Sequence, residues 1–199
     1  MAKTLEFFFD YISPTAFVAN AVVPGVIERT GAELKLRPMF LGGVMQATGN
    51  RPPGTVPAKG KYLGIDLQRC CKRYGLEMHM NPHFPMMNTR ILSGATLRLS
   101  DQPEEQAKLF ASGWKQVWGR PDPIDVGDEE QFKAAFGSDG FNADELWALG
   151  TESETKALLR ANTEEAVERG AFGAPTFFVG DEIFFGHDRL DYAEEALRA

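Results

Sequence analysis

The dipeptide Ser13-Pro14 places a hydroxyl group where it can stabilise an anion. Ser is favoured immediately before a helix, and Pro is favoured at the first helical position. The pair follows a short apolar run at residues 5–9 and precedes an amphipathic helix pattern at residues 15–29. At a helix N-terminus, unpaired amides and the positive end of the helix dipole favour an anion such as a thiolate. Taken alone, however, this dipeptide favours the interpretation that Ser13 only caps the helix.

A second candidate is Pro175, in the segment Gly173-Ala174-Pro175-Thr176. A Pro at the first residue of a strand and after a small residue can form a cis peptide bond, although trans bonds are far more common. We expect Pro175 to be cis, with the N–H and C=O of Ala174 presented to a peptide-like ligand. The alternative is an ordinary trans Pro at the start of a strand.

A third candidate is the acid and base at Asp188 and Arg189, next to His187. At the start of a helix, such a pair can clasp an α-amino-acid group. The carboxylate of the ligand would lie at the helix N-terminus and its ammonium near Asp188. The segment alone favours another interpretation, in which Asp188 caps the helix and Arg189 is a solvated surface residue.

Two groups of strands and helices must position these candidates. Residues 5–9, 15–29 and 33–41 predict a strand, a helix and a strand, which implies a parallel pair with a right-handed crossover. Residues 174–179 and 182–185 flank a Gly-Asp turn and predict a β-hairpin, and a last helix follows it. The order is β-α-β, a helical stretch, then β-β-α. This is a thioredoxin-like α/β fold with a helical insertion, in which the start of the hairpin faces the N-terminus of the first helix.

The middle of the chain predicts the helical insertion. Residues 42–57 are rich in Gly and Pro and predict a loop, after which helical patterns dominate. Thr151-Glu152-Ser153-Glu154 has the form of a capping box ahead of a helix that ends at Gly170, and Asn142 begins a shorter helix. The last helix of the chain is expected from about residue 188 to 197.

These patterns divide the chain into two domains. Residues 1–42 and 171–199 are expected to form the thioredoxin-like domain. Residues 43–170 are expected to form the all-helical insertion domain.

Charge, apolar runs and residue spacing argue against nucleic acid, membranes and metal ions as partners. The formal net charge of −7 disfavours nucleic acid, whose phosphates require clustered Lys and Arg. No apolar run approaches the roughly 20 residues of a membrane helix, so we expect no membrane segment. His79 and His83 are four residues apart, but Pro82 between them breaks a helical metal-binding spacing, so no metal site is expected.

Cys70 and Cys71 are the only cysteines, and they are adjacent. Neighbouring cysteines seldom form a disulfide, and two cannot form a framework. The sequence also lacks a recognisable secretory signal. We therefore expect a reducing, cytoplasmic location and interpret the two cysteines as part of a packed helix.

The segment Phe9-Asp10-Tyr11-Ile12-Ser13-Pro14 resembles the N-terminal signature of 2-hydroxychromene-2-carboxylate isomerases and kappa-class glutathione transferases. The resemblance continues in order through residues 41–45, 48–53, 59–62, 82–85, 88–89, 173–177 and 186–190. The wider group includes DsbA-type oxidoreductases, whose first helix begins with Cys-x-x-Cys. Here Ser13-Pro14-Thr15-Ala16 occupies that place, so both redox sulfurs are missing.

The resemblance implies a function with glutathione as cofactor. It implies cis–trans isomerisation of a small aromatic substrate, either 2-hydroxychromene-2-carboxylate or a similar aryl pyruvate, in aromatic catabolism. A kappa-like glutathione transferase and a non-catalytic thioredoxin-fold binding protein are the alternatives. A homodimer is also implied.

The resemblance further implies the roles of individual residues. Ser13 would be the catalytic residue, donating a hydrogen bond to the glutathione sulfur so that its thiolate is favoured. Asn50 would contact the tripeptide, and the backbone at Ala174 and Pro175 would pair with its cysteinyl part. The γ-glutamyl end would be held by His187 and Asp188.

Overall fold

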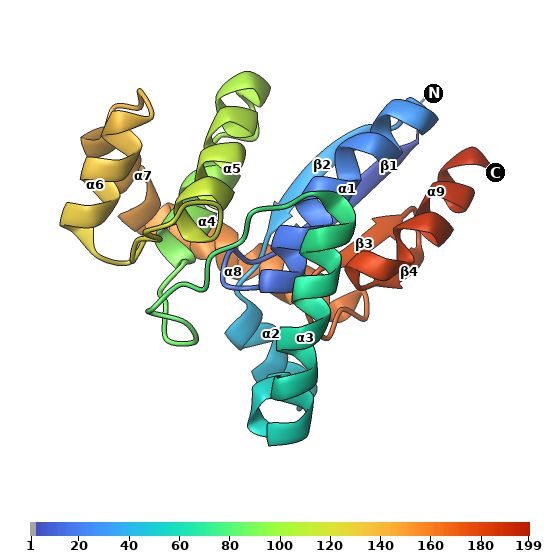
Figure 1. Ribbon diagram of the computed structural model, residues 1–199. Coiled ribbons are helices and arrows are strands. Elements are labelled where there is room, and N and C mark those ends of the chain that lie inside the picture. Colours follow the sequence, from blue (N-terminus) through green and yellow to red (C-terminus); the bar gives the residue numbers. More distant parts are fainter. Residues whose placement is uncertain (1–2) are drawn as a thin grey trace.

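A four-stranded mixed sheet forms the centre of the computed structural model, which describes residues 3–199 (Figure 1). The strand order is β2-β1-β3-β4. β1 and β2 are parallel, whereas β3 is antiparallel to both β1 and β4. The strands are β1 (Thr4–Phe9), β2 (Glu33–Pro38), β3 (Thr176–Val179) and β4 (Glu182–Phe185). With α1 (Pro14–Thr30) between β1 and β2, this confirms the predicted thioredoxin-like fold.

The aromatic residues of β1 supply core to both faces of the sheet. Phe7 and Phe9 lie in the larger apolar cluster, together with residues of α1 and of α9 (Leu190–Arg198). Phe8 faces the other way and packs in a smaller cluster with Phe178. Because successive strand residues point to opposite faces, a continuous apolar run such as this one belongs to a strand covered on both sides.

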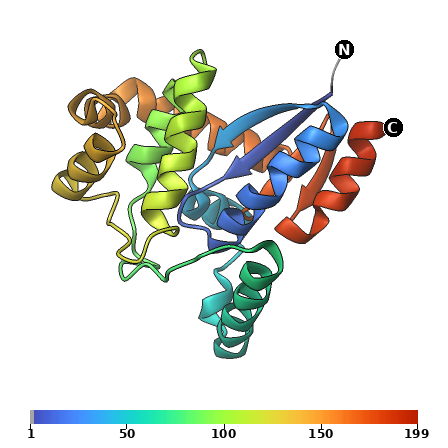
Figure 2. The same cartoon turned by 45° about the horizontal axis from the view of Figure 1, so that its top comes forward.

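Helices occupy the chain between β2 and β3, as predicted. α8 covers the Phe8 face of the sheet, whereas α1 and α9 cover the opposite face (Figure 2). α6 and α7 lie at the far end of the molecule from α9 in both views. These helices are α2 (Leu41–Thr48), α3 (Pro57–Tyr74), α4 (Arg90–Arg98), α5 (Pro103–Val117), α6 (Glu129–Ser138), α7 (Ala143–Thr151) and α8 (Ser153–Glu168).

The loop predicted for residues 42–57 is wrong, because α2 extends from Leu41 to Thr48 and a short 3-10 turn follows at Pro53–Thr55. Gly42 and Gly43 lower the helix propensity of this segment. Burial compensates, since Val44 is fully buried against the Phe8 face of the sheet. A tertiary contact that the local sequence does not reveal has overridden propensity here.

The predicted capping box is also wrong. Thr151 is the last residue of α7, and its hydroxyl donates to the carbonyls of Trp147 and Ala148, each at 3.0 Å. Glu152 precedes α8 and makes no side-chain cap with any described residue. The start at Asn142 is confirmed, because its side chain accepts the amide of Glu145 at 3.4 Å.

Two smaller features complete the fold. The last helix begins at Leu190 rather than Asp188, because His187–Arg189 form a 3-10 turn. In the part of the chain described, no helix has the length and apolarity needed to cross a membrane.

The division of the chain into a thioredoxin-like domain (residues 1–42 and 171–199) and a helical insertion domain (residues 43–170) stays a prediction. Residues 1 and 2 of the first domain lie outside the described part.

Candidate functional site

Ser13 caps α1 at the edge of the sheet where β1 ends. Its Oγ accepts a hydrogen bond from the amide of Ala16 at 3.2 Å, and Pro14 occupies the first helical position. The side chain is only 4% exposed, so its contacts are largely shielded from water. The first turn of α1, which lies wholly in the described part, contains no acidic residue. An anion at this position would therefore meet the positive end of the helix without a competing carboxylate in the first turn.

Pro175 lies beside Ser13, and its peptide bond with Ala174 is cis, as expected from the sequence. The contact is direct, because Ser13 Oγ donates to the carbonyl oxygen of Ala174 at 3.2 Å. The Thr15 hydroxyl also donates to this carbonyl, at 3.1 Å, so a ligand that pairs with the C=O of Ala174 would take the place of a hydroxyl. Pairing of a ligand with the N–H and C=O of Ala174 stays a prediction.

Thr15 is a polar member of the site that the sequence analysis did not select. Its Oγ1 lies 3.0 Å from Ser13 Oγ, so the two hydroxyls and the carbonyl of Ala174 form a closed triangle. Either hydroxyl can donate to this carbonyl. Ser13 can therefore turn its proton toward a ligand while Thr15 keeps the carbonyl of Ala174 hydrogen-bonded. A hydroxyl two residues after a cap residue is the signal that could have indicated Thr15.

Asn50 lies close to the loop that leads to Pro175. Its Nδ2 donates to the carbonyl of Phe172 at 2.7 Å, and its Oδ1 accepts the amide of Arg51 at 2.8 Å. Gly173 permits the ring of Phe185 to pack against this loop, because a Cβ there would lie only 2.8 Å from the ring. The side chain is exposed and remains accessible to a ligand.

His187 and Asp188 lie in the turn after β4, which is tied to Pro175 by a hydrogen bond from the amide of Gly186 to its carbonyl, at 3.0 Å. Asp188 is exposed and forms an ion pair with Arg189 at 2.7 Å. The sequence suggested either that Asp188 and Arg189 clasp a ligand or that Asp188 caps the helix and Arg189 is solvated. In the structure both residues lie on the surface and form an ion pair with each other. Five of the predicted residues thus follow one continuous edge from Ser13 to Asp188, and Asn50 flanks it.

Cys70 extends this edge onto α3. Its Sγ lies 3.1 Å from Nε2 of His187, although the two residues are 117 positions apart. Burial lowers the pKa of His187 below its ordinary value, which favours the neutral imidazole. Burial, with Asp66 nearby, raises the pKa of Cys70, so this sulfur is held as a thiol. No local sequence pattern indicates this pair, because the contact between Cys70 and His187 is made entirely by tertiary packing.

Asp10 anchors the turn that carries Ser13. Its buried carboxylate accepts hydrogen bonds from the amide of Ile12 at 3.1 Å, the amide of Leu41 at 2.9 Å and the hydroxyl of Thr89. The amide of Ser13 donates to the carbonyl of Asp10 at 2.9 Å. Burial raises the pKa of Asp10, and these hydrogen bonds oppose that effect. Asp10 therefore fixes the start of α2, the start of α4 and the Ser13 turn relative to one another.

The site can stabilise and orient a peptide-like anion. Its main groups are a buried hydroxyl at a helix N-terminus, the backbone before a cis-Pro, an exposed amide and an exposed carboxylate. Within the described residues, no group of three or more His, Cys, Asp or Glu side chains could hold a metal ion. The two cysteines are free, so the described site offers no protein disulfide for exchange.

Comparison with known proteins agrees with this geometry. The sequence matches the family described as DSBA-like thioredoxin domain over residues 4–198, and the chain belongs to this family. It is 30% identical over 200 residues to the 2-hydroxychromene-2-carboxylate isomerase of Sphingobium xenophagum, covering 99% of each chain. It is 27% identical over 212 residues to glutathione S-transferase kappa 1 of Homo sapiens, covering 99% of this chain and 92% of that relative.

Solved structures give the same relationship. A 2-hydroxychromene-2-carboxylate isomerase superposes with a TM-score of 0.84 and 25% identity. The superposition covers 98% of this chain and 94% of that one. The family resemblance inferred from the sequence is therefore confirmed.

Proposed function

We propose that this protein is a glutathione-dependent cis–trans isomerase of 2-hydroxychromene-2-carboxylate or a similar aryl pyruvate, acting in aromatic catabolism. The observation that carries the proposal is the buried Ser13 hydroxyl at the N-terminus of α1, in contact with Ala174. This position has a donor for an anion where a redox enzyme of the wider group has a thiol. The full-length similarity to a named isomerase supports the same reaction.

The chemistry of the donor set fits glutathione. When bound, glutathione would supply a thiolate that adds reversibly to the conjugated carbon of the substrate, allows rotation about the former double bond, and leaves unchanged. Ser13 would donate a hydrogen bond to the sulfur and lower the proton affinity of the thiolate. The backbone at Ala174 and Pro175 would align the cysteinyl part, Asn50 would contact the tripeptide, and Asp188 would pair with its ammonium group.

His187 would act beside Asp188 at the γ-glutamyl end. Its imidazole is neutral when the pKa is lowered by burial, so it adds a hydrogen-bonding group there without repelling an ammonium. We further propose a cytoplasmic homodimer, with the free thiols Cys70 and Cys71 consistent with a reducing compartment. Sedimentation at micromolar protein concentration tests the dimer, and a species of 22 kDa contradicts it.

The reaction itself can be tested by counting thiols during turnover. The purified protein is given 2-hydroxychromene-2-carboxylate in large excess over a catalytic amount of glutathione. We expect many turnovers for each glutathione molecule, with constant free thiol, because the cofactor returns after every cycle. No turnover with glutathione present contradicts the proposal.

The kappa-class similarity supplies the second candidate, a transferase. A transferase consumes one glutathione for each product molecule, so free thiol would disappear in step with product. The same experiment therefore separates the two activities. Calorimetry with glutathione alone separates both from a binding protein of another specificity, which would give no saturation up to several millimolar.

A further inference from the structure

Cys70 and His187 form a polar contact at the Asp188 end of the edge that begins at Ser13. Cys70 Sγ lies 3.1 Å from Nε2 of His187, and both side chains are half-buried. The other ring nitrogen, Nδ1, makes no hydrogen bond with any of residues 3–199, and it is not closed off from solvent. One nitrogen of the ring is therefore occupied by a protein group, and the other is free to meet a ligand.

The contact has one favourable arrangement of protons. A thiol is a weak donor and a weak acceptor, whereas the unprotonated nitrogen of a neutral imidazole accepts a hydrogen bond readily. Burial lowers the pKa of His187 and raises the pKa of Cys70, and both effects oppose transfer of the thiol proton to the ring. The favoured arrangement is therefore a thiol that donates to Nε2. A neutral ring carries one proton, which then lies on Nδ1.

Charged side chains surround this contact. Asp66 lies one turn before Cys70 on α3, and Asp188 and Arg189 follow His187 in the chain. Burial lowers the pKa of His187, with a smaller contribution from Arg189, and it outweighs the two carboxylates, which act to raise the pKa. The ring thus stays neutral beside two negative charges and keeps both an acceptor at Nε2 and a donor at Nδ1.

Asp188 supplies a second, complementary group beside the ring. Gly186 permits this carboxylate to fold back over the turn, because a Cβ at Gly186 would lie only 2.6 Å from Oδ1 of Asp188. Arg189 pairs with the other oxygen, Oδ2, at 2.7 Å. A carboxylate oxygen and a neutral N–H donor are therefore both available at this end of the edge. An α-amino-acid group has an ammonium for the first and a carboxylate for the second.

We propose that Cys70 is a positioning residue: its thiol donates to Nε2 of His187 and so keeps a proton on Nδ1, from which the ring donates to the α-carboxylate of the γ-glutamyl group. The proposal rests on the proposed binding of glutathione and adds a residue outside the segments that carry the family resemblance. Without a fixed partner at Nε2, the ring would divide between two forms, of which only one donates from Nδ1. Fixing the donor before the ligand arrives lowers the free-energy cost of binding.

The first test reads the ring directly, without glutathione. The chemical shifts of the ring nitrogens distinguish a protonated nitrogen from an unprotonated one, and His187→Asn identifies the signals. We expect a proton on Nδ1 in the wild type and in Cys70→Ser, whose hydroxyl keeps a donor. Cys70→Ala should shift the proton toward Nε2. A wild-type ring protonated mainly on Nε2 overturns the proposal.

The neighbouring cysteine provides the matched control. Cys71 is also half-buried on α3, but its Sγ contacts Sδ of Met78 at 3.9 Å instead of the ring of His187. Cys71→Ala removes the same atoms from the same helix and should leave the ring proton on Nδ1. A proton that moves equally in Cys71→Ala and Cys70→Ala contradicts a specific role for Cys70.

The second test measures binding by calorimetry under reducing conditions, so that no mixed disulfide forms. The probes are glutathione and γ-aminobutyryl-cysteinyl-glycine, which keeps the amine but lacks the α-carboxylate. We expect Cys70→Ala to weaken glutathione binding about fivefold, the effect of one ordinary hydrogen bond, and to leave binding of the truncated peptide unchanged. Cys70→Ser and Cys71→Ala should bind both probes like the wild type. Adding Cys70→Ala to His187→Ala should have no further effect, because the ring through which Cys70 acts is absent.

The outcomes separate this proposal from the proposed function. If Cys70→Ala binds glutathione as tightly as the wild type, or loses affinity equally for both probes, the proposal fails while glutathione binding stands. A wild type that shows no saturation with glutathione up to several millimolar overturns the proposed function, and with it the ligand named here.

Discussion

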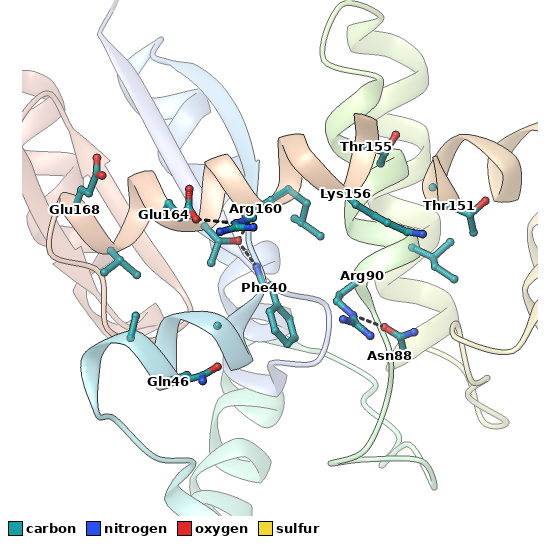
Figure 3. Close-up of a pocket in the computed structure, with 17 residues that line it drawn as sticks. Phe40, Gln46, Asn88, Arg90, Thr151, Thr155, Lys156, Arg160, Glu164 and Glu168 are labelled. Carbon is teal, nitrogen blue, oxygen red and sulfur yellow. Dashed lines mark hydrogen bonds and ion pairs between the residues drawn. The ribbon is translucent and has the colours of Figure 1, made fainter. Parts of the chain in front are cut away.

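The Ser13 turn and the cavity lined by Arg90 and Lys156, between α2, α4, α7 and α8 (Figure 3), present their polar groups in opposite ways. Ser13 is 4% exposed, and its hydroxyl contacts Thr15, Ala174 and the amide of Ala16. Arg90 and Lys156 are exposed and without carboxylate partners in the described chain. A donor that must stabilise charge during a reaction is held in place beforehand, which avoids reorganisation at that moment. Charges that remain in water keep their hydration and attract an anion only from a distance.

The largest expected effect comes from removing the buried donor. Ser13→Ala should lower turnover by roughly 10² or more at neutral pH, the cost seen when one donor to a catalytic anion is lost. Binding of glutathione should change little, because backbone pairing and Asp188 are proposed to hold most of the tripeptide. The loss should shrink at higher pH, where the thiolate forms without help. Rates across a pH series measure this.

The control must separate catalysis from helix capping. Asp128 caps α6 by accepting the amide of Gln131 at 2.9 Å. Asp128→Ala should cost about 1 kcal/mol of stability, as cap removal does elsewhere, and leave turnover unchanged. If Ser13→Ala behaves like Asp128→Ala, with wild-type turnover at every pH, then Ser13 is only a cap and the contrast between the two regions fails.

The next largest effect is expected from Asp10, whose carbonyl bonds to the amide of Ser13 and whose carboxylate bonds to Leu41 and Thr89. Asp10→Asn places an amide nitrogen where an oxygen now accepts the N–H of Leu41 or the hydroxyl of Thr89. An unpaired buried polar group costs about 1–3 kcal/mol, so the free energy of unfolding should fall by that amount in mildly acidic solution. Urea unfolding measures it.

The pH dependence of this difference has a definite sign. Burial raises the pKa of Asp10 above its unfolded value. The stabilisation that follows from this shift is complete below the unfolded pKa and is lost as pH rises through the folded pKa. The gap between wild type and Asp10→Asn should therefore narrow as pH rises. A gap that widens toward neutral pH contradicts this account.

Asp139 provides a control of opposite sign. Burial acts to raise its pKa, but hydrogen bonds from Lys115, Ser112 and Gln116 outweigh burial and lower the pKa overall. The corresponding stabilisation is present above the unfolded pKa and is lost as pH falls through the folded pKa. The gap between wild type and Asp139→Asn should therefore widen as pH rises.

A smaller effect is expected from Thr15. If Ser13 turns its proton to the ligand sulfur, Thr15 must keep the carbonyl of Ala174 bonded. Thr15→Val removes that hydroxyl at nearly constant volume, so the carbonyl competes for the Ser13 proton. Turnover should fall about fivefold, equivalent to one ordinary hydrogen bond of about 1 kcal/mol. Thr15→Ser keeps the hydroxyl and should restore it. Equal rates for the Val and Ser variants contradict this role.

The smallest effect is on the titration of His187. Burial lowers its pKa below the ordinary value of 6.5. Cys70→Gly opens space beside the ring to water and should move the pKa back toward that value. NMR titration can follow the ring, and His187→Asn identifies its signal among those of the three histidines. A pKa that falls further in Cys70→Gly contradicts burial as the cause.

The sequence was informative where the interactions are local. The cap at Ser13 and the hairpin after Pro175 follow from neighbouring residue types, and both are present. The contacts of Asp10 with Leu41 and Thr89 span 31 and 79 residues, and no local pattern predicts them. The same holds for Val44, whose burial on the sheet stabilises a helix across a Gly-rich segment that predicts a loop.

The cavity could be predicted only in part. Phe40 and Arg90 adjoin segments that carry the family resemblance, but Lys156 lies on a helix whose packing the sequence did not reveal. Exposed Lys and Arg residues are common on any surface, so their convergence on one cavity becomes visible only when α4 and α8 are placed together.

The hydrogen bond between Ser13 and Ala174 joins positions 161 residues apart, with consequences for how the protein is made. The helix cap at Ser13 can form early in synthesis, because it requires only the nearby amide of Ala16. The carbonyl of Ala174, to which the Ser13 hydroxyl also bonds, is synthesised much later. Contacts between distant positions are formed late because closing a long loop costs entropy. A nascent chain therefore carries a helix start without a finished site, and any product truncated before residue 174 should be inert toward substrate.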